Sequence, residues 1–121
     1  MENKKIVFIV DDSDSNLLLA KNALEGVYET YALPSAARLF KIMEKITPSL
    51  ILLDVEMPEM DGFEALEALK TGDKLKNIPV IFLTGKEEAG TERRGLEMGA
   101  VDFILKPFSP EDLKERIKTH I

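Results

Sequence analysis

Short apolar runs that alternate with helix-like segments constrain the fold of this chain more than any other feature of its sequence. Four of the runs are continuous and rich in β-branched residues: Ile6–Val10, Leu50–Leu53, Val80–Leu83 and Val101–Leu105, the last interrupted by Asp102. Such runs are typical of strands buried on both faces, as in a parallel sheet covered by helices. A fifth, weaker run over Tyr28–Leu33 alternates in polarity and predicts an edge strand.

Segments with helical periodicity lie between the apolar runs. We expect helices over Ser15–Glu25, Ser35–Ile46, Phe63–Lys70, Glu87–Met98 and Pro110–Thr119. Asp61 and Ser109 are predicted N-caps, and Gly99 suits the position just after a helix. Strand and helix therefore alternate five times, which predicts an α/β fold with a parallel sheet and right-handed crossovers. With 121 residues and no linker-like or repeated segment, we expect one domain over residues 1–121.

Composition excludes several classes of protein. The net charge is −6 and the basic residues form no cluster, so direct binding of nucleic acid is not expected. The chain has no cysteine, which excludes disulfides and thiolate metal sites. No apolar run approaches the roughly 18–20 residues that span a bilayer, so we expect no membrane segment and a cytoplasmic location.

Polar residues end the predicted strands. Asp11 and Asp12 follow the first run, Asp54 follows the Leu50 run, Thr84 follows the Val80 run and Lys106 follows the last run. In open α/β sheets, ligands bind beyond the carboxyl ends of the strands, where the strand order reverses. We therefore expect these side chains to gather at one edge of the sheet.

Three carboxylates gathered in a partly dry site repel one another and require positive charge nearby. Lys106 supplies one charge, and the remaining demand, met by oxygen ligands alone, favours Mg²⁺ over zinc or copper. Mg²⁺ is commonly completed by a phosphate oxygen. Asp54 is then placed to attack phosphorus as a nucleophile, while Lys106 and Thr84 stabilise the transferring group.

The same residues carry a family resemblance over essentially the whole chain. Asp11–Asp12, the segment from Leu53 to Gly62 around Asp54, Thr84–Gly85 and Lys106–Pro107–Phe108 are similar to the signature motifs of bacterial response-regulator receiver domains. The resemblance implies a doubly wound five-stranded parallel sheet of the flavodoxin-like or CheY-like (βα)5 type, with strand order 2-1-3-4-5. It also implies a cis Lys106–Pro107 bond.

The resemblance assigns a role to each site residue. Asp54 is the expected phosphoacceptor. Metal ligation is expected from the side chains of Asp12 and Asp54, from the backbone carbonyl of Glu56, and from Asp11 through water. Thr84 and Lys106 are expected to contact the phosphoryl group, and Phe103 is the expected switch aromatic.

Each of these residues has a simpler interpretation when taken alone. Asp11 or Asp12 suits a helix cap, Thr84 a strand end and Lys106 a solvated surface charge, but agreement at matching strand ends favours a site. Phe103 is also compatible with a purely structural place in the core. His120, the one histidine, is expected to be an exposed residue near the end of the chain and not a phosphodonor to Asp54.

Further hypotheses concern residues near the site. Glu56 and Lys86, each two residues after a site residue, are expected at its rim, where a charge pair would set the lifetime of the phosphorylated state; the alternative is two independent surface charges. Gly90 and Gly95 in the Glu87–Met98 helix either weaken that helix for switching or permit close packing.

The favoured function is a phosphorylation-dependent signalling switch rather than a turnover enzyme. Its expected partners are a histidine kinase or phosphotransfer protein, and a downstream effector or fused output domain reached through the surface of the fourth and fifth helices and fifth strand. Phosphorylation-dependent homodimerisation remains open. The alternatives are a metal-dependent phosphohydrolase and a degenerate receiver that binds partners without phosphorylation. We expect the chain either to act alone or to belong to a longer protein, and slightly favour the latter.

Overall fold

A computed structural model gives the fold, and it describes residues 4–73, 75–85 and 90–121. The strands are β1 (Ile6–Val10), β2 (Glu29–Leu33), β3 (Leu50–Asp54), β4 (Val80–Thr84) and β5 (Asp102–Leu105). The helices are α1 (Asp14–Leu24), α2 (Ala36–Met43), α3 (Gly62–Lys70), α4 (Thr91–Glu97) and α5 (Pro110–His120). Strands and helices alternate along the chain, as the sequence predicts.

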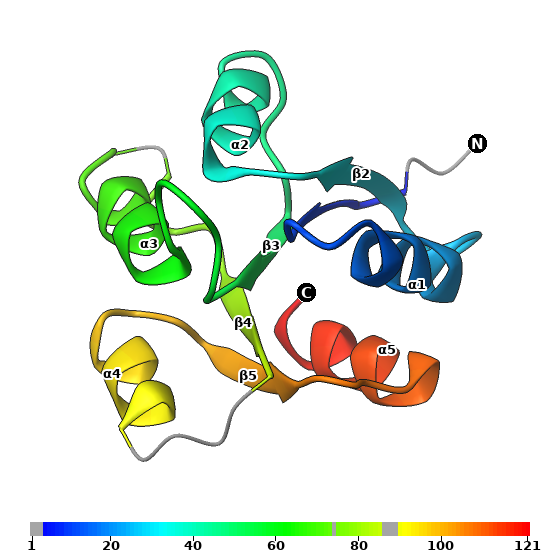
Figure 1. Cartoon of the computed structure of the whole chain (residues 1–121). Helices are drawn as coiled ribbons and strands as arrows, with labels where there is room; N and C mark the ends of the chain where they lie inside the picture. Colours follow the sequence, from blue (N-terminus) through cyan, green and yellow to red (C-terminus); the bar gives the residue numbers. More distant parts are fainter. Residues whose placement is uncertain (1–3, 74, 86–89) are drawn as a thin grey trace.

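The strands form one parallel sheet in the order β2-β1-β3-β4-β5. This order confirms the doubly wound α/β fold and places β2 at an edge, as its alternating pattern predicts. The order reverses between β1 and β3, so the carboxyl ends of these two strands flank the point where such folds bind ligands. Figure 1 shows α1 and α5 on one side of the sheet and α2, α3 and α4 on the other.

Two apolar cores form because the helices cover both faces of the sheet. Side chains of α2 and α3 pack with one set of strand residues, among them Phe8, Ile51 and Phe82. Side chains of α1 and α5 pack with the alternate set, among them Ile9, Leu52 and Ile81. Burial on both faces explains why the central strands are continuously apolar instead of alternating.

Several element boundaries differ from the sequence-based expectation, and those of β5 and α4 matter most for the site. The strand β5 begins at Asp102, and Val101 before it is 38% exposed. The helix α4 begins at Thr91, and Gly90 precedes it as the N-cap with φ 99°. Gly90 therefore does not lie inside the helix, and residues 87–89 lie outside the described residues.

Gly95 lies inside α4 and packs tightly against the sheet. A Cβ at this position would lie 2.7 Å from the ring of Phe82 and 2.9 Å from Cζ of Phe103. These contacts favour the close-packing interpretation of this glycine.

The predicted caps are present where they position the site. Asp61 caps α3 by accepting a hydrogen bond from the Glu64 amide at 2.8 Å, and the Glu64 side chain accepts one from the Asp61 amide at 3.0 Å. Ser109 caps α5, and Gly99 follows α4 with φ 111°. The Lys106–Pro107 bond is cis, as the resemblance implies.

Gly62, the first residue of α3, contacts the backbone of the β3 end, and its replacement has a predictable cost. A Cβ at Gly62 would collide with the Asp54 carbonyl oxygen and lie 2.8 Å from the Val55 Cα, so rigid backbone would have to move. We expect Gly62→Ala to lower the free energy of unfolding by about 1–2 kcal/mol, measured by urea denaturation. Gly72→Ala is the matched control, because a Cβ there meets Leu75 at an ordinary 3.5 Å. Equal stability of the Gly62 and Gly72 variants would contradict the prediction.

Candidate phosphorylation and metal site

The strand register brings the predicted site residues to one edge of the sheet. Val10 pairs with Leu53, so the next residues, Asp11 and Asp54, face each other across neighbouring strands. The chain beyond each strand end stays paired: the Val55 amide donates to the Leu83 carbonyl at 3.0 Å, and the Lys106 amide donates to the Thr84 carbonyl at 2.8 Å. The sequence prediction that these strand ends converge is therefore confirmed.

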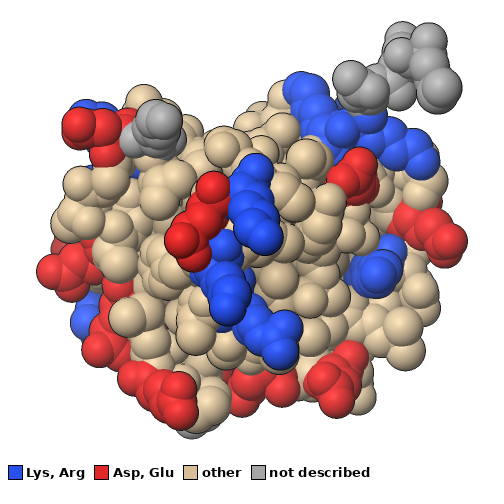
Figure 2. Space-filling view, turned by 90° about the horizontal axis from the view of Figure 1, so that it is seen from above, with Lys and Arg blue, Asp and Glu red and all other residues tan. Residues whose placement is uncertain are grey.

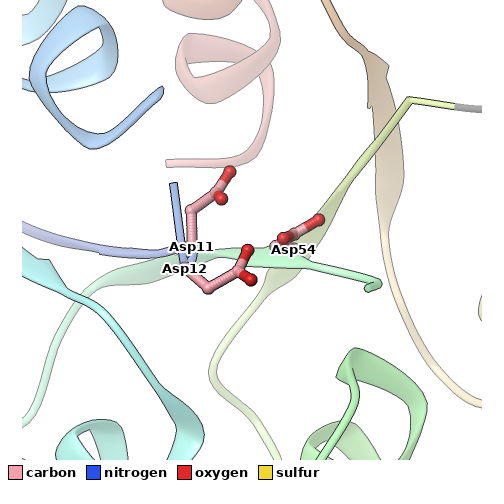
Figure 3. A group of neighbouring side chains, drawn as sticks. All are labelled: Asp11, Asp12 and Asp54. Carbon is pink, nitrogen blue, oxygen red and sulfur yellow. The ribbon is translucent and has the colours of Figure 1, made fainter. Parts of the chain in front are cut away.

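Asp11, Asp12 and Asp54 form a compact acidic cluster at this edge. Each offers a carboxylate oxygen, and these oxygens all lie within 4.8 Å of one another. Figure 3 shows Asp11 and Asp12 side by side, with the Asp12 carboxylate directed toward Asp54. Asp11 and Asp54 are buried and Asp12 is exposed, so the cluster is open to solvent on the Asp12 side.

Lys106 neutralises part of the acidic cluster. Its Nζ lies 2.8 Å from Asp11 Oδ2 and 2.9 Å from Asp54 Oδ1, and its side chain is only 17% exposed. The Asp54 Oδ1 also accepts a hydrogen bond from the Glu56 amide at 3.3 Å. One ammonium group therefore bridges the two buried carboxylates, and Asp12 is not part of this contact.

Burial dominates the electrostatics of Asp54. Loss of solvent raises the pKa of its carboxyl to about 7; the Lys106 contact opposes this rise, and the Asp11 charge adds to it. For Lys106, burial acts to lower the pKa, but the contacts with Asp11 and Asp54 outweigh burial and raise it. The surroundings of the site thus favour the charged form of Lys106 and oppose ionisation of Asp54.

The residues present fit a hard divalent cation. The donor set consists of oxygens, and one ammonium group faces three carboxylates. Asp11 Oδ2 is buried and accepts no well-aligned hydrogen bond among the described residues, although Lys106 lies close to it. Oxygen ligands with excess negative charge and one solvent-accessible side are the chemistry of a Mg²⁺ site.

Thr84 lies beside the cluster, and Phe103 lies in the apolar core between β5 and α4. Thr84 is 5% exposed at the end of β4 and lines the same cavity as Asp12. Phe103 is 7% exposed, its ring centroid lies 5.9 Å from that of Phe82, and it also contacts Gly95. The aromatic side chain already lies in the core, so both the switch role and the purely structural role remain compatible with its position.

Only one half of the predicted Glu56–Lys86 pair lies within the described residues. Glu56 is exposed and lines the cavity beside Asp12 and Thr84, which agrees with the predicted rim position. Lys86 lies outside the described residues. The rim pair and the use of the Glu56 carbonyl as a metal ligand therefore stay predictions.

The expectation that His120 is an exposed terminal residue is wrong. Its Nε2 lies 3.0 Å from Asp102 Oδ2, and its side chain is 23% exposed. The helix α5 continues through His120, so His120 and Arg116 are four residues apart and share one helix face. Arg116 binds the other oxygen of Asp102 at 2.7 Å, and the Asp102 pKa is lowered because contacts from the Phe103 amide, His120 and Arg116 outweigh burial.

A cavity of about 610 Å³ opens beside the acidic cluster. Its described lining combines polar residues of the strand ends with residues of the β3–α3 loop and of α4: Asp12, Val55, Glu56, Met57, Pro58, Asp61, Phe63, Thr84, Thr91 and Arg94. Sequence patterns did not single out Arg94. Arg94 lines the cavity only because α4 packs beside α3, and the one local sign of this in the sequence is its position just before Gly95.

A second groove, of about 450 Å³, lies away from the cluster near α2. It is lined by Leu33, Arg38, Lys41, Ile42, Glu44 and Lys45. Figure 2, which looks down on the α2 side, shows basic and acidic side chains lying next to one another on this face. The described lining of this groove contains one carboxylate, Glu44, so it does not show the converging acids that make the strand-end site suited to a cation.

Among the described residues, every helix is too short or too polar to cross a lipid bilayer.

Known proteins match this chain over nearly its whole length. The model of the response regulator receiver domain family matches residues 7–118. A probable cyclic di-GMP phosphodiesterase of Vibrio cholerae serotype O1 is 40% identical over 95% of this chain and 26% of its own length. The polar-differentiation response regulator DivK of Brucella anthropi is 34% identical over 97% of this chain and 96% of its own length.

Solved structures agree with these sequence matches. The chemotaxis protein CheY4 of Vibrio cholerae superposes with a TM-score of 0.92 and 28% identity, covering 98% of this chain and 99% of that protein. The chain spans only part of several curated relatives: 26% of the length of the phosphodiesterase, and 48% and 49% of the probable transcriptional regulators ycf27 of Cyanophora paradoxa and Porphyra purpurea. Sequence, fold and the acidic strand-end site thus agree, and the chain belongs to the response regulator receiver domain family.

Proposed function

We propose that this chain is a phosphorylation-dependent signalling switch of a two-component phosphorelay, in which Asp54 accepts a phosphoryl group with the help of Mg²⁺. One observation carries the proposal: the buried Asp54 carboxylate lies within 4.8 Å of two further carboxylates and 2.9 Å from the Lys106 ammonium. This combination suits the attack of a carboxylate oxygen on phosphorus, with positive charge ready for the phosphoryl oxygens.

In this proposal the cation is held by Asp12, Asp54 and the backbone carbonyl of Glu56, with Asp11 acting through water. When bound, Mg²⁺ supplies positive charge that neutralises phosphoryl oxygens during transfer. Asp12 is the exposed member of the cluster, so it is the carboxylate that an arriving cation meets first.

The proposed transfer step involves Asp54, Lys106 and Thr84 of this chain. A carboxylate oxygen of Asp54 forms a bond to phosphorus, and the bond between phosphorus and the donor atom breaks, its electron pair leaving with the donor. The donor is a phosphohistidine of a histidine kinase or phosphotransfer protein. Lys106 is positioned to move its contact from the Asp54 carboxylate to a phosphoryl oxygen, and the Thr84 hydroxyl to donate a hydrogen bond to another.

The proposed output surface lies on α4, β5 and α5. Leu96, Val101 and Leu105 are 46%, 38% and 45% exposed, an amount of apolar surface that suits contact with a partner. Phe103 on β5 contacts Gly95 of α4, which offers a path from the site to this surface. We propose that a downstream effector or a fused output domain reads it; pairing of two phosphorylated copies is a further option.

The test is phosphorylation by acetyl phosphate followed by intact-protein mass spectrometry. We expect the wild-type protein with Mg²⁺ to gain the mass of one phosphoryl group, and to gain none after chelation of Mg²⁺ or in Asp54→Ala. Failure of the wild-type protein to gain this mass in the presence of Mg²⁺ would contradict the proposal. Repeated turnover of a phosphate monoester would instead favour the phosphohydrolase interpretation.

A further inference from the structure

The cavity beside the acidic cluster has an unfavourable charge for a phosphodonor. Asp12, Glu56 and Asp61 line it, and a carboxylate oxygen of Asp54 lies within 4.8 Å of one of Asp12. Lys106 is engaged with Asp11 and Asp54. Among the described residues that line the cavity, Arg94 is the one cation. An anionic donor therefore passes carboxylates on its way to Asp54, and among the described lining residues Arg94 is the positive charge that can offset them.

The Arg94 side chain is held at the cavity wall by an aromatic ring. Its guanidinium carbon lies 4.1 Å from the centroid of the Phe63 ring, a cation–π contact. Phe63 is itself fixed, because it is 8% exposed and packs edge-on against Phe82, with 5.3 Å between the ring centroids. No ion pair between Arg94 and a carboxylate is found among the described residues, and Arg94 lines the cavity, so its guanidinium donors are available to an anion that enters there.

We propose that Arg94 is a donor-binding residue, which attracts the phosphate of an incoming phosphodonor and hydrogen-bonds one of its oxygens before transfer to Asp54. The inference rests on the proposed function of Asp54 and adds a residue to it. The simpler alternative is that Arg94 only covers the Phe63 ring and ties α4 to α3. The two roles differ in what they require, since attraction needs a positive charge and covering the ring needs only an apolar or flat group.

Acetyl phosphate is the probe, because it presents the phosphate without a protein surface. In the reaction an Asp54 oxygen bonds to phosphorus, the bond between phosphorus and the acetyl oxygen breaks, and acetate leaves with its electron pair. Initial rates at low donor concentration and saturating Mg²⁺ give the second-order rate constant. Arg94→Met removes the charge but retains contact with Phe63, and Arg94→Lys keeps the charge but loses the planar stack. Arg93→Met, on the neighbouring exposed residue, is the matched control.

The rate constant of Arg94→Met is expected to fall about 3- to 10-fold at low ionic strength, and the difference from wild type to shrink as salt is added. Arg94→Lys should retain at least about half of the wild-type rate constant, and Arg93→Met should resemble wild type. Equal rate constants for Arg94→Met and wild type, or an Arg94→Lys variant as slow as Arg94→Met, would overturn the inference while leaving Asp54 phosphorylation intact. A wild-type protein that takes up no phosphate would contradict both the role of Arg94 and the proposed function of Asp54.

Discussion

Replacement of Lys106 with alanine is expected to lower the free energy of unfolding by about 2–3 kcal/mol in metal-free buffer at neutral pH. Lys106 is the shared partner of Asp11 and Asp54, whose side chains are 0% and 4% exposed. Its removal leaves two buried carboxyl groups close together without a counter-charge. Ionising both is then opposed by desolvation and mutual repulsion, and keeping Asp54 neutral requires uptake of a proton, so the folded state loses stability in either case. Urea denaturation with a chelator present measures the change.

A second variant separates this electrostatic cause from lost packing. Lys106→Met keeps most of the apolar stem and removes only the charge, so it is expected to lose nearly as much stability as Lys106→Ala. Addition of Asp54→Asn to Lys106→Ala should recover part of the loss, because one of the uncompensated charges is gone. Additive effects in the double variant, or a Lys106→Met protein as stable as wild type, would show that the ammonium does not stabilise the cluster.

Replacement of Asp54 with asparagine is expected to stabilise the metal-free protein by about 2–3 kcal/mol above neutral pH. Asparagine keeps an oxygen that accepts hydrogen bonds from Lys106 and the Glu56 amide, but it removes one charge from a buried acidic cluster. The proposed phosphoacceptor is thus expected to lower stability, as is common where a site is arranged for chemistry instead of packing.

The pH dependence of this effect has a definite sign. The Asp54 pKa is raised from 3.8 to about 7 in the folded protein, so the folded state holds this proton more tightly than the unfolded state. The unfavourable contribution is absent below about pH 3.8, grows as pH rises, and is complete above about pH 7. The stability difference between Asp54→Asn and wild type should therefore widen over this interval, measured by urea denaturation at a series of pH values.

Addition of Mg²⁺ should make the wild-type protein more stable than Asp54→Asn. A cation that binds the folded wild-type cluster stabilises it by mass action, whereas Asp54→Asn has lost a carboxylate ligand and should gain less. Because ligation requires an ionised carboxylate, the affinity of the wild-type protein for Mg²⁺ should rise as pH increases toward and past about 7. A difference between the two proteins that is flat with pH and unaffected by Mg²⁺ would contradict the assigned electrostatics of Asp54.

The fold and the acidic site were accessible from sequence because both depend on short-range patterns. The run Ile6–Val10 is the observed β1 to the residue, and the polar residues that end the runs do meet at one edge. Parallel pairing makes this possible, since every strand delivers its carboxyl end to the same side of the sheet. A polar residue at the end of a buried strand was therefore informative before its neighbours were known.

Features that depend on packing between elements were not accessible. Arg94 becomes part of the cavity only because α4 lies beside Phe63 of α3, a contact between residues distant in the chain. His120 is paired because α5 turns one face toward Asp102 on β5, and the start of α4 moved to Thr91 because Gly90 adopts a left-handed conformation. Gly95 was ambiguous in sequence, and the rings of Phe82 and Phe103 decide its role.

The most direct test of the central claim is chemical mapping of the phosphorylated residue. An acyl phosphate on aspartate is reduced by borohydride to homoserine, which marks the position in peptide mass spectra. After incubation with acetyl phosphate and Mg²⁺, we expect homoserine at position 54 and at no other aspartate, with no mark when Mg²⁺ is chelated. A mark at Asp11 or Asp12 instead, or no acyl phosphate in the unaltered protein, would contradict the account.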